Sequence, residues 1–154
     1  MSFELKSSAF GEGQNIPKKY SCEGSDSSPD FSWGQPPAGT QEFVLIADDP
    51  DAPAGTWVHW VLYGIPGERR SLPEGISKGD QVSDGGVQGK NSFGFNGYGG
   101  PCPPHGKPHR YFFKLYALSK HLQATSPGMS KEQLLAAIQG AVLGETQLMG
   151  TFAR

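Results

Sequence analysis

Three long apolar runs stand out along the chain, and each predicts a β-strand. They cover residues 42–48, 57–65 and 109–118. In the second run both alternating faces are apolar except for His59, which is expected to share a face with Val61 and Tyr63. A strand that is apolar on both faces is covered on both sides, as in the centre of a β sandwich.

A second kind of periodicity predicts one helix over residues 130–143. Ser130 and Gln133 have the spacing of a capping box at its start. Gly144 is a typical stop signal after its end. Apolar residues recur at helical spacing and form one face, which consists of Leu134, Leu135, Ile138, Ala141 and Val142.

Weaker patterns complete the expected fold. Phe3 and Leu5 alternate with polar residues and indicate an entry strand within residues 1–20. A short strand is expected over 30–33, and a final strand or tail over 145–152. With no internal repeat or second domain evident, we expect an antiparallel β sandwich with one peripheral helix, in a single domain over residues 1–154.

The composition supports a loop-rich β protein, because Gly 22 and Pro 13 make up a little over a fifth of the 154 residues. The formal net charge of -2 leaves no basic footprint, so nucleic acid is not an expected partner. No apolar run reaches the roughly 18 residues that a membrane span needs. The first residues show no secretion signal, so we expect a cytoplasmic protein.

Residues 84–108 are rich in glycine and proline, a composition that is also typical of flexible linkers. However, Phe93, Phe95 and Tyr98 are interleaved with the glycines, and linkers rarely carry aromatic side chains. We therefore expect an ordered loop, in which glycine lets the backbone approach a neighbour closely.

The two cysteines, Cys22 and Cys102, lie far apart in the sequence. In a cytoplasmic protein two reduced thiols are the expected state. A disulfide or a redox pair is the alternative, because the sequence does not report the distance between the two side chains.

Five polar residues lie at the margins of the predicted strands, next to proline or glycine loops. Asp49 and Asp51 follow the first strand, and His59 lies on an apolar strand face. His109 and Tyr111 share one face at the start of the third strand. Each has a structural explanation by itself, as a turn cap, a core histidine or a core tyrosine. Together they predict a small polar pocket in an apolar frame.

Three kinds of chemistry fit such a pocket. Two histidines and two aspartates are acceptable ligands of zinc or iron, but no compact ligand spacing is present. A His–Asp pair would serve a hydrolase; because no Gly-x-Ser-x-Gly elbow exists, Ser7, Ser28 and Cys102 stay open as its nucleophile. Protonated histidines, the Tyr111 hydroxyl and N–H groups of the glycine loop would bind a phosphate. Such an anion site would weaken as the pH rises above about 6.5, the value for free histidine.

Two motifs in combination resemble the phosphatidylethanolamine-binding protein family, also called the Raf kinase inhibitor protein family. The first motif is Asp49-Pro50-Asp51-Ala52-Pro53 followed by His59-Trp60. The second motif is Gly100-Pro101-x-Pro103-Pro104 followed by Pro108-His109-Arg110-Tyr111. The likeness runs from Phe3 to Phe152, and the chain is similar to the short bacterial or archaeal branch of that family.

The resemblance implies a Greek-key β fold of two antiparallel sheets, with a pocket for phosphate, phosphoryl head groups or carboxylate anions. The ligand residues that it implies are Asp49, Asp51, His59, Gly100, His109 and Tyr111. It also implies cis peptide bonds before Pro53 and before one proline of residues 101–104. It implies no metal ion, no cofactor and no catalytic residue.

Family members mostly act by binding, so the resemblance implies a non-enzymatic regulator or inhibitor. A kinase or a protease is the kind of protein partner implied, and a homodimer is the implied assembly. Two alternatives stay open: a metal-assisted or His–Asp hydrolase, and a protease inhibitor that acts through an exposed loop.

Overall fold

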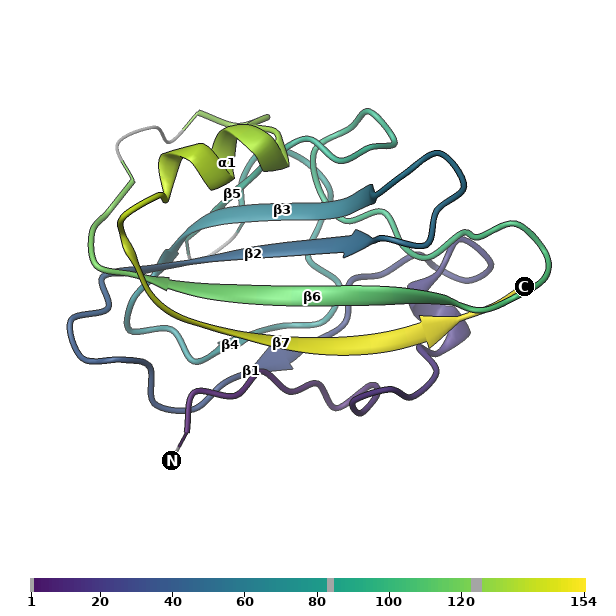
Figure 1. Ribbon diagram of the computed structural model, residues 1–154, viewed down its shortest axis with the longest axis horizontal. Coiled ribbons are helices and arrows are strands. Elements are labelled where there is room, and N and C mark those ends of the chain that lie inside the picture. The colour runs from purple at the N-terminus through teal and green to yellow at the C-terminus, as the bar shows by residue number, and fades with distance from the viewer. Residues whose placement is uncertain (1, 83–84, 123–125) are drawn as a thin grey trace.

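Five strands form one antiparallel sheet through the centre of the protein in the computed structural model, which describes residues 2–82, 85–122 and 126–154 (Figure 1). The strand order is β5-β3-β2-β6-β7. Their bounds are Glu42–Asp49 for β2, Trp57–Pro66 for β3, Val87–Gln88 for β5, His109–Leu118 for β6 and Val142–Phe152 for β7. The three apolar runs thus form strands within one residue of their predicted bounds.

The strands are connected as a Greek key. β2, β3 and β5 lie side by side in chain order, and β6 returns through a long connection to pair with β2. β1 (Phe31–Ser32) and β4 (Ser71–Leu72) form a separate two-stranded antiparallel sheet. The predicted β sandwich of two antiparallel sheets is confirmed, although most of its second layer is chain without strand pairing.

Apolar side chains fill both faces of the central sheet. One cluster, which includes Trp60 and Phe113, packs against Leu5 of the N-terminal segment and against the β1–β4 layer. A second cluster, which includes Val61 and Leu134, lies between the opposite face and helix α1 (Figure 1). Each large side chain that is fully buried in these clusters contributes roughly 1.5–3 kcal/mol.

The predicted capping box begins the helix. The Gln133 N–H donates to the Ser130 hydroxyl at 3.1 Å, and the Ser130 N–H donates to the Gln133 side-chain oxygen at 3.0 Å. The helix itself, α1, covers only Lys131–Ala137. The local signal at the start of the helix was therefore correct, and the predicted length was not.

The helix ends at Ala137, and the chain turns toward β7 at Gly140 and not at Gly144. Gly140 has a φ of 81°, which only glycine adopts without strain. Two residues later Val142 pairs with Leu118 as the first residue of β7. The prediction of a helix through residue 143 was wrong, because pairing along the otherwise open edge of β6 outweighs the helical periodicity.

The entry strand expected within residues 1–20 was also wrong. Lys6 and Ser32 exchange two backbone hydrogen bonds of 2.8 Å, but they form a single isolated bridge. Just beyond the bridge, the backbone N–H and the hydroxyl of Ser8 donate to the Asp30 carboxylate. These side-chain hydrogen bonds replace a strand ladder. Leu5 is nevertheless buried, as its pattern indicated.

The glycine-rich segment is ordered where it is described; Asp84, its first residue, lies outside the described ranges. The buried Asn91 side-chain oxygen accepts hydrogen bonds from the N–H groups of Phe93 and Phe95, at 2.9 and 3.3 Å. A Cβ on Gly99 would lie 2.5 Å from the Phe93 ring, so any other residue there would have to displace this ring. The close approach expected of the glycines therefore occurs, and the neighbour is the chain itself.

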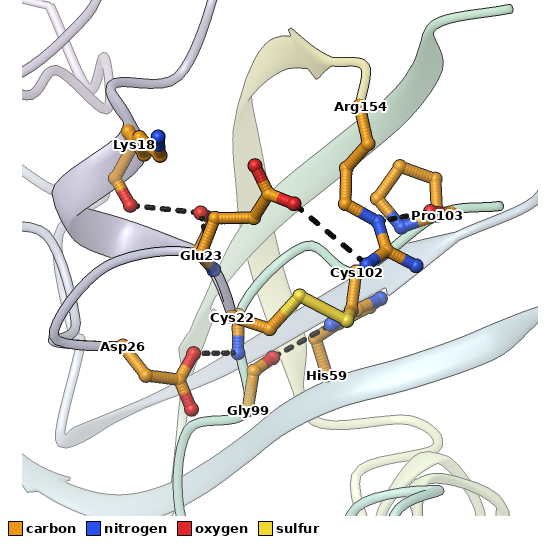
Figure 2. Close-up of a disulfide and its surroundings, with 11 residues drawn as sticks. Lys18, Cys22, Glu23, Asp26, His59, Gly99, Cys102, Pro103 and Arg154 are labelled. Atoms are coloured by element: carbon orange, nitrogen blue, oxygen red, sulfur yellow. Dashed lines mark hydrogen bonds and ion pairs between the residues drawn. A yellow bond between two sulfur atoms is a disulfide. The ribbon is translucent and has the colours of Figure 1, made fainter. Parts of the chain in front are cut away.

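Cys22 and Cys102 form a disulfide, with their Cα atoms 5.4 Å apart (Figure 2). The prediction of two reduced thiols was wrong. Cys22 follows the short 3-10 helix η1 (Lys18–Tyr20), and its N–H donates to the Pro101 carbonyl at 3.1 Å. This contact brings two loops together across a sequence separation of 80 residues, which no local pattern reports.

Two further observations concern the expected backbone and membrane features. The described peptide bonds are all trans, so the cis bonds implied before Pro53 and within residues 101–104 are absent from that part of the chain. Trans is the form that X–Pro bonds prefer, by about 0.5–1 kcal/mol. No described helix has the length and apolar character that crossing a lipid bilayer requires.

Removing the disulfide is expected to destabilise the fold. The double variant Cys22→Ser/Cys102→Ser loses a cross-link across 80 residues, which is worth roughly 2–4 kcal/mol of unfolding free energy. Urea denaturation should show this loss as a lower midpoint. The matched control is wild-type protein in dithiothreitol, which should reach the same lower midpoint. An unchanged midpoint in both samples would contradict the expectation.

Candidate functional site

The termini of four strands lie together at one end of the central sheet (Figure 1). Antiparallel neighbours place the end of one strand beside the start of the next. Asp49 at the end of β2 pairs with Trp57 at the start of β3, and His109 at the start of β6 pairs with Phe152 at the end of β7. This end of the sheet borders a cavity of about 210 Å³. Its lining consists of Asp49, Ala52, Pro53, Trp57, His59, Phe93, Cys102, Pro103, Pro104, His109 and Tyr111.

A β-bulge in β3 interrupts the strand pairing at His59. Ala47 of β2 pairs with Trp60, and the next residue, Asp48, pairs with Val58. His59 is therefore an extra residue with no partner of its own on β2. Such a bulge reverses the alternation of side chains along the strand.

The bulge places the His59 side chain on the face where the cavity lies. Its ring centroid is 5.2 Å from that of Tyr111, in an edge-to-face contact. Val61 and Tyr63 lie on the opposite face, in the cluster under α1. The prediction that His59 shares a face with these two residues was wrong, because strict alternation does not continue through a bulge.

The His59 ring is held by the glycine-rich loop. Its Nδ1 lies 2.6 Å from the Gly99 carbonyl oxygen (Figure 2), and the Gly99 N–H donates to the His59 carbonyl at 2.9 Å. A carbonyl oxygen only accepts, so Nδ1 carries a proton and Nε2 of the neutral ring is an acceptor. Burial lowers the pKa of His59 below its usual 6.5. At neutral pH the cavity therefore contains a neutral imidazole at this position.

Asp49 and His109 form a hydrogen-bonded pair in the cavity lining. His109 Nδ1 lies 2.7 Å from Asp49 Oδ2, and the Asp49 side chain is only 4% exposed. The other Asp49 oxygen accepts the N–H of Asp51 at 2.7 Å. Both oxygens of this buried carboxylate thus have a donor, and His109 keeps its Nε2 for another partner.

The Tyr111 hydroxyl is a buried polar group without a hydrogen-bond partner among the residues that the structure describes. Burial raises the pKa of Tyr111, and the nearby Asp49 and Asp51 carboxylates raise it further, so the hydroxyl keeps its proton. An unpaired buried hydroxyl costs about 1–3 kcal/mol. Such a group in a cavity lining indicates a site for water or a ligand.

Asp51 does not line the cavity. Its carboxylate accepts two hydrogen bonds from the Arg110 side chain, at 2.8 and 2.9 Å, and one from the Arg110 N–H at 2.9 Å. The Arg110 guanidinium lowers the pKa of Asp51 to about 2. Asp51 therefore ties the turn after β2 to the start of β6 and leaves Asp49 as the aspartate at the cavity.

Gly100 also lies outside the cavity lining. Its N–H donates to the Asp26 carboxylate at 2.8 Å. A Cβ at this position would lie 2.2 Å from the Tyr20 carbonyl oxygen, so glycine is needed for packing against this loop. Among the six implied ligand residues, the structure brings Asp49, His59, His109 and Tyr111 together at the cavity.

An aromatic and proline rim surrounds these polar groups, and sequence reasoning did not assign it to the site. Trp57 and Phe93 meet edge-to-face at 5.4 Å, and Phe93 also lies 5.4 Å from the His59 ring. Phe93 is 41% exposed, which is unusual for such a side chain. Pro103 and Pro104 form the other wall. The interleaved aromatics of the glycine-rich segment were the one available signal.

The hydrolase alternatives find little support in this arrangement. Cys102 is in the disulfide, the Ser28 hydroxyl accepts the Ile76 N–H at 2.9 Å, and Ser7 lies beside Asp30. Neither serine lines the cavity. In the described part of the chain, no three His, Cys, Asp or Glu side chains gather as a metal site would need.

Fold and cavity together define a class of protein: a Greek-key β sandwich with a small polar pocket at one end of its central sheet, beside the strand termini. The family model described as phosphatidylethanolamine-binding protein matches residues 6–153, and the chain belongs to this family. The chain is 47% identical over 150 residues to a UPF0098 protein of Methanothermobacter thermautotrophicus, covering 97% of this chain and 98% of the relative. It is also 47% identical over 152 residues to a UPF0098 protein of Aquifex aeolicus, covering 98% and 88%.

Two solved structures share the fold. The putative phosphatidylethanolamine-binding protein homolog CT736 from Chlamydia trachomatis superimposes with a TM-score of 0.89 at 40% identity, covering 99% of this chain and 98% of that one. YbcL of E. coli, described as a member of the mammalian PEBP family, has a TM-score of 0.92 at 30% identity, covering 100% and 99%. The family and fold expectations are thus confirmed.

The buried neutral His59 should make stability depend on pH. Its pKa is lowered in the folded protein, so the unfolded chain binds more protons, and stability is lost as the pH falls through about 6.5. The variant His59→Asn does not titrate and carries an amide N–H for the Gly99 carbonyl. Urea denaturation between about pH 7 and about pH 5 should show a shallower loss of stability in the variant. Equal slopes in both proteins would contradict this account.

Proposed function

We propose that this cavity binds a small oxyanion, such as phosphate or the phosphoryl group of a small molecule or protein side chain. In this proposal the protein acts by binding and not by catalysis. The observation that carries it is the Tyr111 hydroxyl, which is buried in the cavity lining between two histidines and has no partner among the described residues.

Each polar group at the cavity has a role in the proposed binding. The protonated Tyr111 hydroxyl donates to an anion oxygen. His59 presents Nε2 as an acceptor, which suits the O–H of a singly charged phosphate. Asp49 orients His109 so that its Nε2 is free to bind the ligand. Because both Asp49 oxygens already accept hydrogen bonds, its repulsion of the anion is partly offset.

The size and rim of the cavity limit the ligand. A volume of about 210 Å³ suits a phosphoryl group with a small substituent and is too small for lipid acyl chains. The apolar rim of Trp57, Phe93 and the prolines excludes water, which strengthens hydrogen bonds made inside. The family description names phosphatidylethanolamine, whose head group is a phosphoryl ester, and this also supports a phosphoryl ligand.

Several expectations stay predictions beside this proposal. Direct ligand contacts of Asp51 and Gly100 are among them, and the geometry favours positioning roles for both. The homodimer and the kinase or protease partner are also predictions. The cytoplasmic location is a prediction too. The disulfide counts against it, because disulfides persist mainly in oxidising compartments. The family match over residues 6–153 supports a single domain.

Removing the Tyr111 hydroxyl should separate binding from stability. Tyr111→Phe should weaken phosphate binding by about ten- to a hundredfold, the value of one hydrogen bond to a charged group. Because the hydroxyl has no partner among the described residues, the free energy of unfolding should stay equal or rise. Isothermal titration calorimetry and urea denaturation would measure the two effects.

The matched control is Tyr116→Phe. Tyr116 lies on the same strand, on the face that packs toward α1, so phosphate affinity should not change. Unchanged affinity in Tyr111→Phe, or an equal loss in both variants, would overturn the proposed site.

Affinity for a phosphate monoester should fall as the pH rises from about 5.5 to about 8. With its lowered pKa, His59 can pair with the anion only by accepting from a protonated phosphate oxygen or by taking up a proton itself. A phosphate monoester loses both routes at higher pH, because its dianion carries no O–H and His59 stays neutral. Sulfate does not titrate in this range, so any fall in its affinity reports on the protein alone. Affinity that is flat for both anions would contradict the role given to His59.

A further inference from the structure

A solvent-exposed disulfide forms part of the cavity wall. Cys102 lines the cavity together with Pro103 and Pro104, whereas Cys22 belongs to a loop that contributes no lining residue. Both cysteines are exposed, so a thiol in solution can reach the bond without unfolding of the protein. The one covalent cross-link of this wall is therefore open to thiols in solution.

Few other contacts hold the same wall (Figure 2). Arg154 Nε donates to the Pro103 carbonyl at 2.6 Å, and the Gly106 N–H donates to the Arg154 carbonyl at 3.3 Å. Arg154 is itself held by an ion pair of 3.8 Å with Glu23, in the loop that contains Cys22. Residues 104–108 are exposed. The hydrogen bond of 3.1 Å from the Cys22 N–H to the Pro101 carbonyl also joins the two loops. Opening the disulfide would leave the wall held by this hydrogen bond and by the contacts of Arg154.

The polar floor of the cavity is attached in a different way. Asp49, His59, His109 and Tyr111 lie in β2, β3 and β6, which pair with one another in the central sheet. Their positions do not depend on the disulfide loop, apart from the Gly99 contact of His59. Reduction would therefore loosen one wall around an intact set of binding groups.

We propose that Cys22–Cys102 is a redox-sensitive modification site that sets the affinity of the cavity for its anion. The oxidised protein holds the wall in place and binds, and the reduced protein binds more weakly. This inference rests on the proposed function. An ordered wall lowers the cost of binding and excludes water from the hydrogen bonds made inside.

The reductant is a dithiol. One of its thiolates attacks a sulfur of the Cys22–Cys102 bond, forms a mixed disulfide and releases the other cysteine as a thiolate. The second dithiol sulfur then displaces the remaining cysteine. In total, two electrons and two protons pass to the cysteine pair, and the dithiol becomes a cyclic disulfide.

Calorimetric titration with inorganic phosphate tests the proposal on the full chain, at a temperature where circular dichroism shows every sample folded. Wild type reduced by dithiothreitol should bind about five- to tenfold more weakly than the oxidised protein. The variant Cys22→Ser/Cys102→Ser should bind like reduced wild type and should not respond to dithiothreitol. Arg154→Met, which frees the Pro103 carbonyl and keeps the disulfide, should also weaken binding in the oxidised protein.

Three results would overturn the proposal, and they differ in what else they reject. Equal affinity of oxidised and reduced wild type rejects the redox link and leaves the proposed function standing. Absence of phosphate binding by the oxidised protein rejects both. On reduction, hydrogen exchange should become faster by a larger factor at the amides of residues 102–107 than at those of residues 57–63, which speed up only through the lower global stability. Equal acceleration in both segments would mean general destabilisation, and this too rejects the redox link.

Discussion

A single extra residue in β3 turns the His59 ring toward Tyr111, and the site depends on this bulge. Without it, alternation would place the imidazole on the face under α1, away from the cavity. The bulge is held in place from the loop side, because His59 and Gly99 exchange a side-chain and a backbone hydrogen bond. Since Gly99 also packs closely against the Phe93 ring, the loop and the bulge support each other.

The distribution of hydrogen-bond partners separates the structural polar groups from those left for a ligand. Asp49 has a donor on each oxygen, and Asp51 is paired with Arg110. By contrast, the Tyr111 hydroxyl has no partner in the described part of the chain. The carboxylates fix the turn and orient the His109 imidazole, and the Tyr111 hydroxyl and His59 Nε2 are left for the proposed anion. This arrangement suits an anion site in a protein with a formal net charge of -2.

Strands and loops have separate roles in the cavity. Paired strands carry the polar floor, and loops held by side-chain contacts, Arg154 and the disulfide carry the wall. Asp26 illustrates the loop contribution: it adopts a φ of 58°, unusual for a residue with a side chain, while its carboxylate accepts the Gly100 N–H. In the proposed redox response, the paired strands of the floor keep the polar groups in place while the wall loosens.

The sequence by itself determined the features that arise from local patterns. Runs rich in apolar residues defined β2, β3 and β6 within a residue, and the spacing of Ser130 and Gln133 defined the start of α1. The two motifs were sufficient for the family. The tertiary structure alone decided the end of α1, the disulfide and the face on which His59 lies. Each of these depends on a partner far away in the sequence: the open edge of β6, a loop 80 residues distant, and the pairing register with β2. Local patterns carry no information about such partners, because strand register and loop contacts are set only when the whole chain packs.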